Sequence, residues 1–212
     1  MKTAIIGLGH IGRQLAMNLI AGGEEVIVAD HGPTKAEDLA RVSGGKARAV
    51  SVAAAIDEAA IIVFAVYFDV IKRLLTDHRD KLAGKIVVDP SNPIAPDGAG
   101  GFKKIVPVDQ SSGEILAALL PAGARFVKAF GTLTASSLQS GARRTPEPNV
   151  LFYASDDRDA GNAVADLIRA SGFAPVRVGG LSKAIRIEAF GDLHEFGKLG
   201  KLVTATQAAA LV

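Results

Sequence analysis

The chain has 212 residues, of which 49% are hydrophobic, and its formal net charge at pH 7 is +2. This length suits one sizeable α/β domain, or one domain with an appendage, and the hydrophobic content is enough for a large core. A charge so close to zero argues against nucleic-acid binding through bulk charge. The absence of cysteine excludes disulfides, thiolate catalysis and cysteine metal sites.

Membrane and export signals are also missing from the sequence. No apolar stretch reaches the roughly 18 residues that a membrane span needs. The apolar run at the N-terminus is interrupted at once by Gly7, Gly9 and His10, whereas a signal peptide has a longer unbroken apolar centre. We therefore expect a cytoplasmic protein with neither a nucleic acid nor a membrane as its partner.

The first half alternates short apolar runs, typical of buried strands, with amphipathic runs at helical spacing. The predicted strands are 3–7, 24–30, 46–50, 61–66 and 85–91, and the predicted helices are 11–23, 35–42, 51–59 and 69–82. Ser51 is a natural N-cap for the third helix, and Gly22 with Gly23 ends the first. This regular alternation with short connections predicts a parallel sheet with helices on both faces.

The second half is less regular. Its predicted strands are 125–133, 150–155 and 175–180, and its predicted helices are 111–120 and 157–172. The glycine-rich segment 96–104 is predicted to be a loop, and 138–149 a mobile loop. We expect a doubly wound, mostly parallel, Rossmann-like α/β domain over 1–180. A C-terminal helical tail over 181–212 would then complete a pocket or a dimer interface.

The sequence GLGHIG at 7–12 follows the first predicted strand and opens the first predicted helix. In this context Gly7 would make the tight turn, Gly9 would let the backbone approach a pyrophosphate, and Gly12 would let the helix pack on the strand. The free N–H groups of the helix N-terminus would face the phosphates. The turn, with Leu8, His10 and Ile11 between its glycines, therefore predicts a dinucleotide site.

The identity of the dinucleotide is left open by the end of the second strand. Asp30 could accept hydrogen bonds from the hydroxyls of the adenosine ribose, which favours NAD. His31, Thr34 and Lys35 could together hold a 2′-phosphate, which favours NADP. The residues alone lean slightly to NAD, and Asp30, His31 and Lys35 are predicted cofactor contacts in either case.

Four stretches resemble one known family. They are MKTAIIGLGHIG at the start, VVDPSNP at 87–93, LLPAGARFVKAFGTL at 119–133 and GGLSKAIRIE at 179–188. Together they make the chain similar to the coenzyme F-420-dependent NADP oxidoreductases, small Rossmann proteins related to the N-terminal domain of pyrroline-5-carboxylate reductases. The chain departs from the family pattern at Gly131, where the family has Asn, at Asp30-His31, where it has a Ser/Arg-type phosphate site, and at Ile185, where it has Arg.

The resemblance implies hydride transfer between the nicotinamide C4 of NADP or NAD and the C5 of a deazaflavin, with coenzyme F-420 as the small-molecule electron acceptor. Such a reaction needs two stacked rings and the exclusion of water rather than acid-base residues. The resemblance also implies an acceptor pocket lined by Phe130, Gly131, Thr132 and Leu133. Further cofactor contacts are expected after the fourth and fifth strands, at Ala65, Val66, Tyr67, Asn92 and Pro93.

Catalytic residues are not identified by the sequence. His10, inside the glycine turn, is a weak candidate that would otherwise only cover the pyrophosphate. His194 would either reach the site of a partner subunit or satisfy local backbone. The cations Lys103, Lys104, Arg143 and Arg144 would meet an acidic acceptor tail or, as the better alternative, be solvated. No residues show convincing metal-ligand spacing.

Three functions remain open at this stage. The first is reduction or oxidation of a deazaflavin-like acceptor. The second is an oxidoreductase with a flavin or a small carbonyl or imine acceptor. The third is a dinucleotide-binding sensor without catalysis. The small apolar residues of LVTATQAAALV at 202–212 suit close helix packing and suggest a homodimer.

Overall fold

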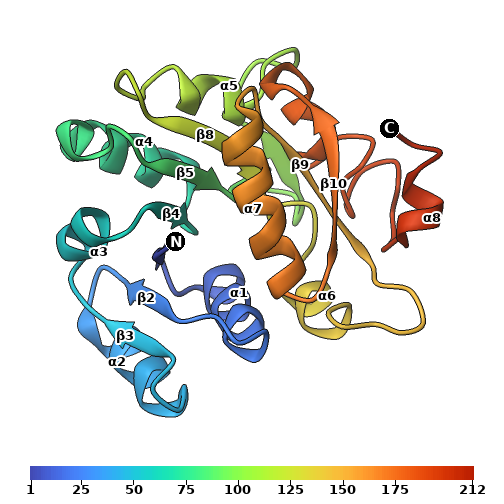
Figure 1. The fold of residues 1–212 in the computed structure, drawn as a ribbon. Helices are drawn as coiled ribbons and strands as arrows, with labels where there is room; N and C mark the ends of the chain where they lie inside the picture. Colours follow the sequence, from blue (N-terminus) through green and yellow to red (C-terminus); the bar gives the residue numbers. More distant parts are fainter.

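The computed structural model describes residues 1–212 and consists of an eight-stranded sheet with helices on both faces, together with a separate two-stranded sheet (Figure 1). The strands of the large sheet are β1 (Thr3–Ile6), β2 (Val26–Ala29), β3 (Ala47–Ala49), β4 (Ile61–Phe64), β5 (Ile86–Asp89), β8 (Arg125–Ala129), β9 (Val150–Ala154) and β10 (Ala174–Gly179). They coincide with the eight strands that the sequence predicts.

The helices that join them are α1 (His10–Ala21), α2 (Pro33–Val42), α3 (Val52–Glu58), α4 (Phe68–Asp77), α5 (Ser112–Ala117), α6 (Ala135–Ser140), α7 (Arg158–Ala170) and α8 (Ala205–Ala208). Two 3-10 segments, Arg79–Lys81 and Leu181–Ile187, follow α4 and β10. Six of the eight α-helices match individually predicted helices, α8 lies within the predicted C-terminal helical tail, and α6 is not predicted.

The strand order is β10-β9-β8-β5-β4-β1-β2-β3. Strands β1 to β5 and β8 are parallel to one another, while β9 runs antiparallel to β8 and carries the parallel β10 at the edge. The parallel part has the doubly wound Rossmann order, in which the chain leaves β1 first to one side and then returns to the other. The predicted fold class is therefore confirmed.

The core explains why the strands are so apolar. Every residue of β1, β2, β4 and β5 is buried, because helices cover both faces of the sheet. One cluster of 27 buried residues joins the sheet to α1, α2 and α7 on one face, through side chains such as Leu15, Leu39 and Ile168. A second cluster of 17 joins the other face to α3, α4 and α5.

Two predicted loops contain regular structure. The segment 96–104 was expected to be a loop, but β6 (Ile94–Pro96) and β7 (Phe102–Lys104) form an antiparallel hairpin there. Its glycines lie in the hairpin tip, where Asp97 Oδ1 accepts hydrogen bonds from the N–H groups of Ala99 and Gly101. The helix α6 extends into the segment that was predicted to be a loop from residue 138.

The C-terminal segment has less helix than the sequence suggested, since it contains only the 3-10 segment and the four-residue α8. Glycines interrupt the segment and let its backbone fold back closely on itself, since a Cβ on Gly197 would lie 1.7 Å from the carbonyl oxygen of Gly191. The segment packs on β9 and β10 through a third cluster of nine buried residues, which includes Phe152, Ile187 and Leu193. In Figure 1 it covers the opposite end of the sheet from β3 and α2. The boundary between 1–180 and 181–212 as separate units stays a prediction.

Candidate functional site

The residues that follow the parallel strands meet at one edge of the sheet. Gly7 follows β1, Asp30 follows β2, Tyr67 follows β4, Asn92 follows β5 and Gly131 follows β8. Because the strand order reverses direction between β1 and β4, a crevice is expected at this edge beside them. The edge therefore collects most of the cofactor and pocket residues that the sequence singles out.

The glycine turn has the geometry that a phosphate site requires. Gly7 has φ +96°, and a Cβ there would lie 2.5 Å from the carbonyl oxygen of Ala65. A Cβ on Gly12 would lie 1.9 Å from the carbonyl oxygen of Gly7, so this glycine lets α1 pack on the turn. Gly9 differs from both, because its φ is −70° and a Cβ there would meet nothing within 4 Å. The turn thus needs two of its glycines for folding and leaves the third facing open space.

The start of α1 completes this site. The helix begins at His10 with Gly9 as its N-cap, and no side chain caps it. Its first N–H groups and its positive dipole end are therefore free to bind an anion. Around the turn, Leu8 is buried, Ile11 is half-buried against the core and His10 is exposed. These features fit a pyrophosphate, and they place His10 at the mouth of the site.

The residues after β4 line the other side of the turn. Ala65 and Val66 are half-buried and lie directly against Gly7, because a Cβ on this glycine would come within 2.5 Å of both residues. Tyr67 is the N-cap of α4 and is 84% exposed, so its ring is available to a ligand. The following aromatic residue, Phe68, is buried in the core instead.

Asp30 lies at the end of β2 with two basic neighbours. Its Oδ1 accepts hydrogen bonds from the backbone N–H of His31 at 2.8 Å and from the ring of His31 at 2.9 Å. Lys35 Nζ lies 3.5 Å from Oδ2. Burial acts to raise the pKa of Asp30, but the hydrogen bonds from His31 and the charge of Lys35 outweigh it and hold the pKa below its ordinary value. The carboxylate is therefore ionised at neutral pH.

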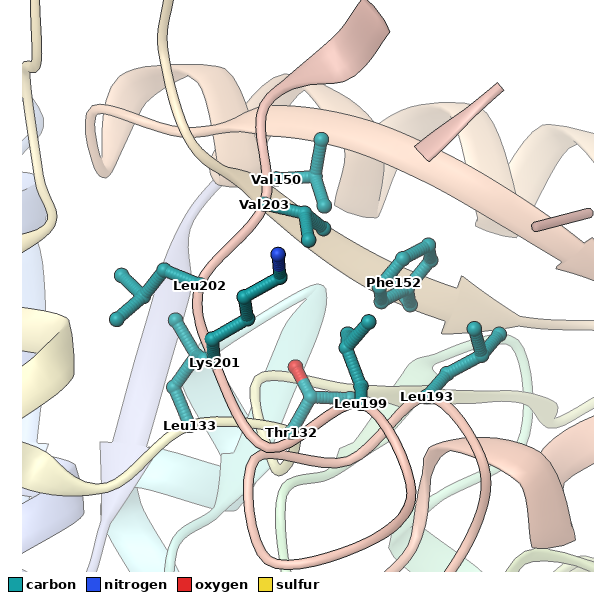
Figure 2. Close-up of a pocket in the computed structure, with 9 residues that line it drawn as sticks. All are labelled: Thr132, Leu133, Val150, Phe152, Leu193, Leu199, Lys201, Leu202 and Val203. Atoms are coloured by element: carbon teal, nitrogen blue, oxygen red, sulfur yellow. The ribbon is translucent and has the colours of Figure 1, made fainter. Parts of the chain in front are cut away.

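The predicted acceptor pocket residues are buried beneath the C-terminal segment. Phe130 has φ +65° and no exposed surface, and Gly131, Thr132 and Leu133 are buried as well. A cavity of only about 10 Å³ lies beside Thr132 and Leu133, between β9 and the C-terminal segment (Figure 2). That volume is barely enough for one water molecule. That these four residues line an acceptor pocket stays a prediction.

Asn92 and Pro93 lie where β5 meets the C-terminal segment. Asn92 Nδ2 donates to the carbonyl oxygen of Gly131 at 3.0 Å, and its Oδ1 accepts from the N–H of Ala189 at 2.7 Å. The side-chain amide of Asn92 is therefore occupied by backbone groups, and the adjacent Pro93 is buried. Their predicted role beside the nicotinamide stays a prediction.

His194 is 3% exposed and has a partner on each ring nitrogen. Its Nδ1 accepts from the N–H of Phe196 at 2.9 Å, so the proton is on Nε2, which donates to the carbonyl oxygen of Gly131 at 2.9 Å. Burial lowers the pKa of His194, which keeps the ring neutral. Of the two roles that the sequence left open, the structure shows the local one, with His194 satisfying backbone groups of its own chain.

A buried ionic cluster under the same region was missed by the sequence reasoning. Lys128 Nζ donates to Asp89 Oδ2 at 2.6 Å and to Ser112 Oγ at 2.8 Å, and Ser112 Oγ donates to Glu188 Oε1 at 2.7 Å. All four residues are at most 1% exposed. The available signal was a lysine and an aspartate inside two apolar strand patterns, because charges in such strands must find partners.

The four cations that could meet an acidic acceptor tail differ from one another in their contacts. Arg143 is committed to the fold, since its guanidinium donates to the carbonyl oxygens of Asn18 at 2.6 Å and Ala170 at 2.8 Å. Lys104 Nζ donates to carbonyl oxygens of its own hairpin region, those of Val108 and Gln110. Lys103 and Arg144 are exposed.

Two further features are absent from the structure. None of the helices is both long enough and apolar enough to cross a lipid bilayer. No group of three or more His, Asp or Glu side chains is placed to hold a metal ion.

Comparison with known proteins points to one family. Residues 2–93 match the family described as NADP oxidoreductase coenzyme F420-dependent. The chain is 30% identical to the F420-dependent NADP reductase of Methanothermobacter thermautotrophicus, over 89% of this chain and 85% of that protein. It is also 32% identical to the metalloreductase STEAP3 of Rattus norvegicus over 89% of this chain, but the match spans only 36% of that protein.

Solved structures share the fold of this chain. A hypothetical protein of Sinorhizobium meliloti is 34% identical, with a TM-score of 0.82, over 92% of this chain and 93% of that one. A pyrroline-5-carboxylate reductase of Coxiella burnetii shares the fold at 17% identity, with a TM-score of 0.67, over 90% of this chain and 64% of that one. The relation to pyrroline-5-carboxylate reductases that the sequence suggested is thus present at the level of the fold.

Proposed function

Since this chain belongs to the coenzyme F420-dependent NADP oxidoreductase family, whose members are NAD(P)-dependent oxidoreductases, we propose that it transfers a hydride between a nicotinamide dinucleotide and a deazaflavin acceptor of the coenzyme F-420 type. The observation that carries this proposal is the glycine turn. Gly9 faces open space next to an uncapped helix N-terminus, at the point where the strand order reverses. A pyrophosphate needs this combination.

Some residues at this edge of the sheet would bind the dinucleotide, and others would shield the reacting rings from water. The N–H groups at the start of α1 would hold the pyrophosphate, and Asp30 would contact the adenosine ribose. Tyr67, exposed beside the turn, offers a flat apolar surface to a ring. The bound nicotinamide supplies the hydride chemistry itself. The protein's part is to hold two rings together and keep water out, which explains why no acid-base pair is needed at the edge.

Titration of the purified protein with NADH and with NADPH, each alone and with oxidised coenzyme F-420, tests the proposal. Binding is followed by nucleotide fluorescence and turnover by the absorbance of the deazaflavin. We expect binding together with loss of the deazaflavin absorbance. Binding without that loss would refute the acceptor and retain the nucleotide site.

The variant Gly9→Val tests the glycine turn directly. The backbone at Gly9 is one that valine adopts, and nothing obstructs its side chain, so the fold should be kept. The side chain would occupy the space of the pyrophosphate, and we expect nucleotide affinity to fall by about 100-fold or more. The melting temperature without nucleotide is the control. Unchanged affinity in a folded variant would exclude the turn as the phosphate site.

A second candidate function is nucleotide binding without hydride transfer to F-420. It is favoured by the burial of Phe130 to Leu133, because the cavity beside Thr132 and Leu133 (Figure 2) measures only about 10 Å³. A reductase with a flavin, carbonyl or imine acceptor would also bind nucleotide without consuming F-420. Adding riboflavin or a simple cyclic imine to the nucleotide complex, and following nucleotide oxidation, separates these two outcomes.

We also propose a homodimer and a cytoplasmic location. The dimer is supported by the small apolar residues near the C-terminus and by Phe190 and Phe196, which are exposed on the C-terminal segment. A monomer in size-exclusion chromatography with light scattering would refute it. The location is supported only by the absence of cysteine, which suits a reducing compartment. A fluorescent fusion tests it.

A further inference from the structure

The two carboxylate oxygens of Asp30 differ in their hydrogen bonds, because Oδ1 has donors and Oδ2 has none. Its side chain is 8% exposed, and Oδ1 has both hydrogen bonds that His31 donates to it. Oδ2 is buried and accepts no hydrogen bond, since Lys35 Nζ, at 3.5 Å, is its only charged neighbour and makes no hydrogen bond to it. A buried acceptor without a donor is destabilising unless something else supplies the donor.

Lys35 covers this oxygen only loosely. The lysine side chain is 55% exposed, projects from the first turn of α2 and has no other ion pair. It can therefore move into solvent when a ligand approaches Oδ2. The ligand that fits must bring hydrogen-bond donors, because an ionised carboxylate can only accept.

We propose that Asp30 makes this chain select NAD(H) over NADP(H), by accepting hydrogen bonds at Oδ2 from the 2′- and 3′-hydroxyls of the adenosine ribose. The proposal rests on the proposed dinucleotide site at the glycine turn and specifies which nucleotide that site takes. A 2′-hydroxyl donates the hydrogen bond that Oδ2 lacks. A 2′-phosphate has no such donor to offer at neutral pH and would place its negative charge beside the carboxylate.

The cations near Asp30 do not compensate for this repulsion. Lys35 and the ring of His31 both face Asp30 already, so a phosphate would have to take them away from a carboxylate that stays in place. The next arginines along the chain are also engaged. Arg41 pairs with Asp38 at 2.7 Å, and Arg48 pairs with Glu58. The end of β2 therefore lacks the free guanidinium that typically binds a 2′-phosphate.

The test is binding rather than turnover. Titration of the purified protein with NADH and with NADPH, followed by nucleotide fluorescence and by the rise in melting temperature, gives the affinity ratio of the two nucleotides. We expect NADH to bind at least about tenfold more tightly than NADPH, the size of one hydrogen bond to a charged group. Tighter binding of NADPH would overturn the inference and leave the proposed function intact. Failure of both nucleotides to bind would refute the dinucleotide site itself.

Two variants identify the residue responsible. Asp30→Asn keeps the size of the side chain and removes its charge, and we expect it to shift the ratio toward NADPH by about tenfold. Asp166→Asn is the matched control, because it removes the same charge from an exposed i,i+3 pair on α7, away from the end of β2, and should leave the ratio unchanged. An equal shift in both variants would show a general charge effect and overturn the role of Asp30.

The variant Lys35→Gln distinguishes this inference from the alternative that Lys35 and His31 bind a 2′-phosphate. If Lys35 only covers Oδ2, its removal should leave NADH binding unchanged or tighter and should not weaken NADPH selectively. If Lys35 and His31 form a phosphate site, NADPH binding should fall selectively, and this result would overturn the inference. The melting temperature without nucleotide shows that each variant is folded.

Discussion

The residues that follow the parallel strands meet at one edge of the sheet, and this edge has two different regions. Around β1 and β2 it consists of backbone, glycine and one acidic side chain. Around β5 and β8 it consists of buried charged and polar side chains. Gly9 faces open space, and His10 is exposed. Lys128 on β8 and Glu188 in the C-terminal segment, in contrast, are both buried. The first region is built within one βαβ unit, while the second is assembled by residues from four distant segments. We therefore expect substitutions in the second region to affect stability, and those in the first to affect ligand binding.

Lys128→Met tests the buried region most severely. It removes the only cation of the cluster and leaves the carboxylates of Asp89 and Glu188 in the protein interior. Breaking a buried ion pair in this way typically lowers the free energy of unfolding by about 3–5 kcal/mol. Urea unfolding measures the loss. Nucleotide affinity of the folded fraction should stay close to that of the original chain, because the cluster does not reach the glycine turn.

The control for this variant is Lys72→Met. Lys72 pairs with Asp69 at 2.7 Å on the exposed face of α4, so the same chemical change should lower stability by less than about 1 kcal/mol. A similar loss in both variants would mean that burial does not distinguish the two pairs. A large loss of nucleotide affinity in Lys128→Met would mean that the two regions of the edge are coupled.

The sequence predicted the sheet because each of its strands is a local pattern. The apolar run IIVFAV at 61–66 contains β4, and because both faces of this strand are buried no alternating pattern is needed to recognise it. The hairpin at 94–104 was missed because its strands are three residues long and only half-buried or exposed. The helix α6 was missed because a distant residue helps to fix its start, with Glu195 accepting a hydrogen bond from the N–H of Thr134.

The same distinction applies to the candidate site. The glycine turn could be predicted, since the spacing of Gly7, Gly9 and Gly12 relative to one strand and one helix determines its geometry. The ionic cluster could not, because Lys128 and Ser112, together with Asp89 and Glu188, come from four segments whose proximity depends on the whole topology. His194 was noticed, but its partner Gly131 lies 63 residues away, so its role required the structure.

The pH dependence of stability probes His194. Burial lowers the pKa of His194 in the folded state below its ordinary value of 6.5, so the unfolded chain binds more protons between these two values. Stability should therefore fall as the pH falls below about 6.5, by at most about 1.4 kcal/mol per pH unit from this residue. Protonation of Nδ1 would also break the hydrogen bond from Phe196.

His194→Gln isolates this contribution. Urea unfolding at about pH 7.5 and about pH 5.5 should show a smaller loss of stability on acidification in this variant than in the original chain. His78→Gln, which removes a histidine at the end of α4, serves as the control and should keep the original dependence. If His194→Gln keeps it too, the carboxylates rather than His194 determine the acid response of this chain.

The exposed ion pair between Arg48 and Glu58, at the β3 edge of the sheet, is the counterpart of the buried cluster. It joins β3 to α3, and both side chains are substantially exposed. Arg48→Gln should therefore lower the free energy of unfolding by less than about 1 kcal/mol, because water solvates both charges when the pair is broken. Added salt at about 0.5 M should remove most of the difference from the original chain, since salt screens exposed charges. The loss in Lys128→Met should persist in the same salt, because ions cannot reach a cluster from which solvent is excluded. A difference in Arg48→Gln that survives salt would show that this end of the sheet also depends on a fixed charge.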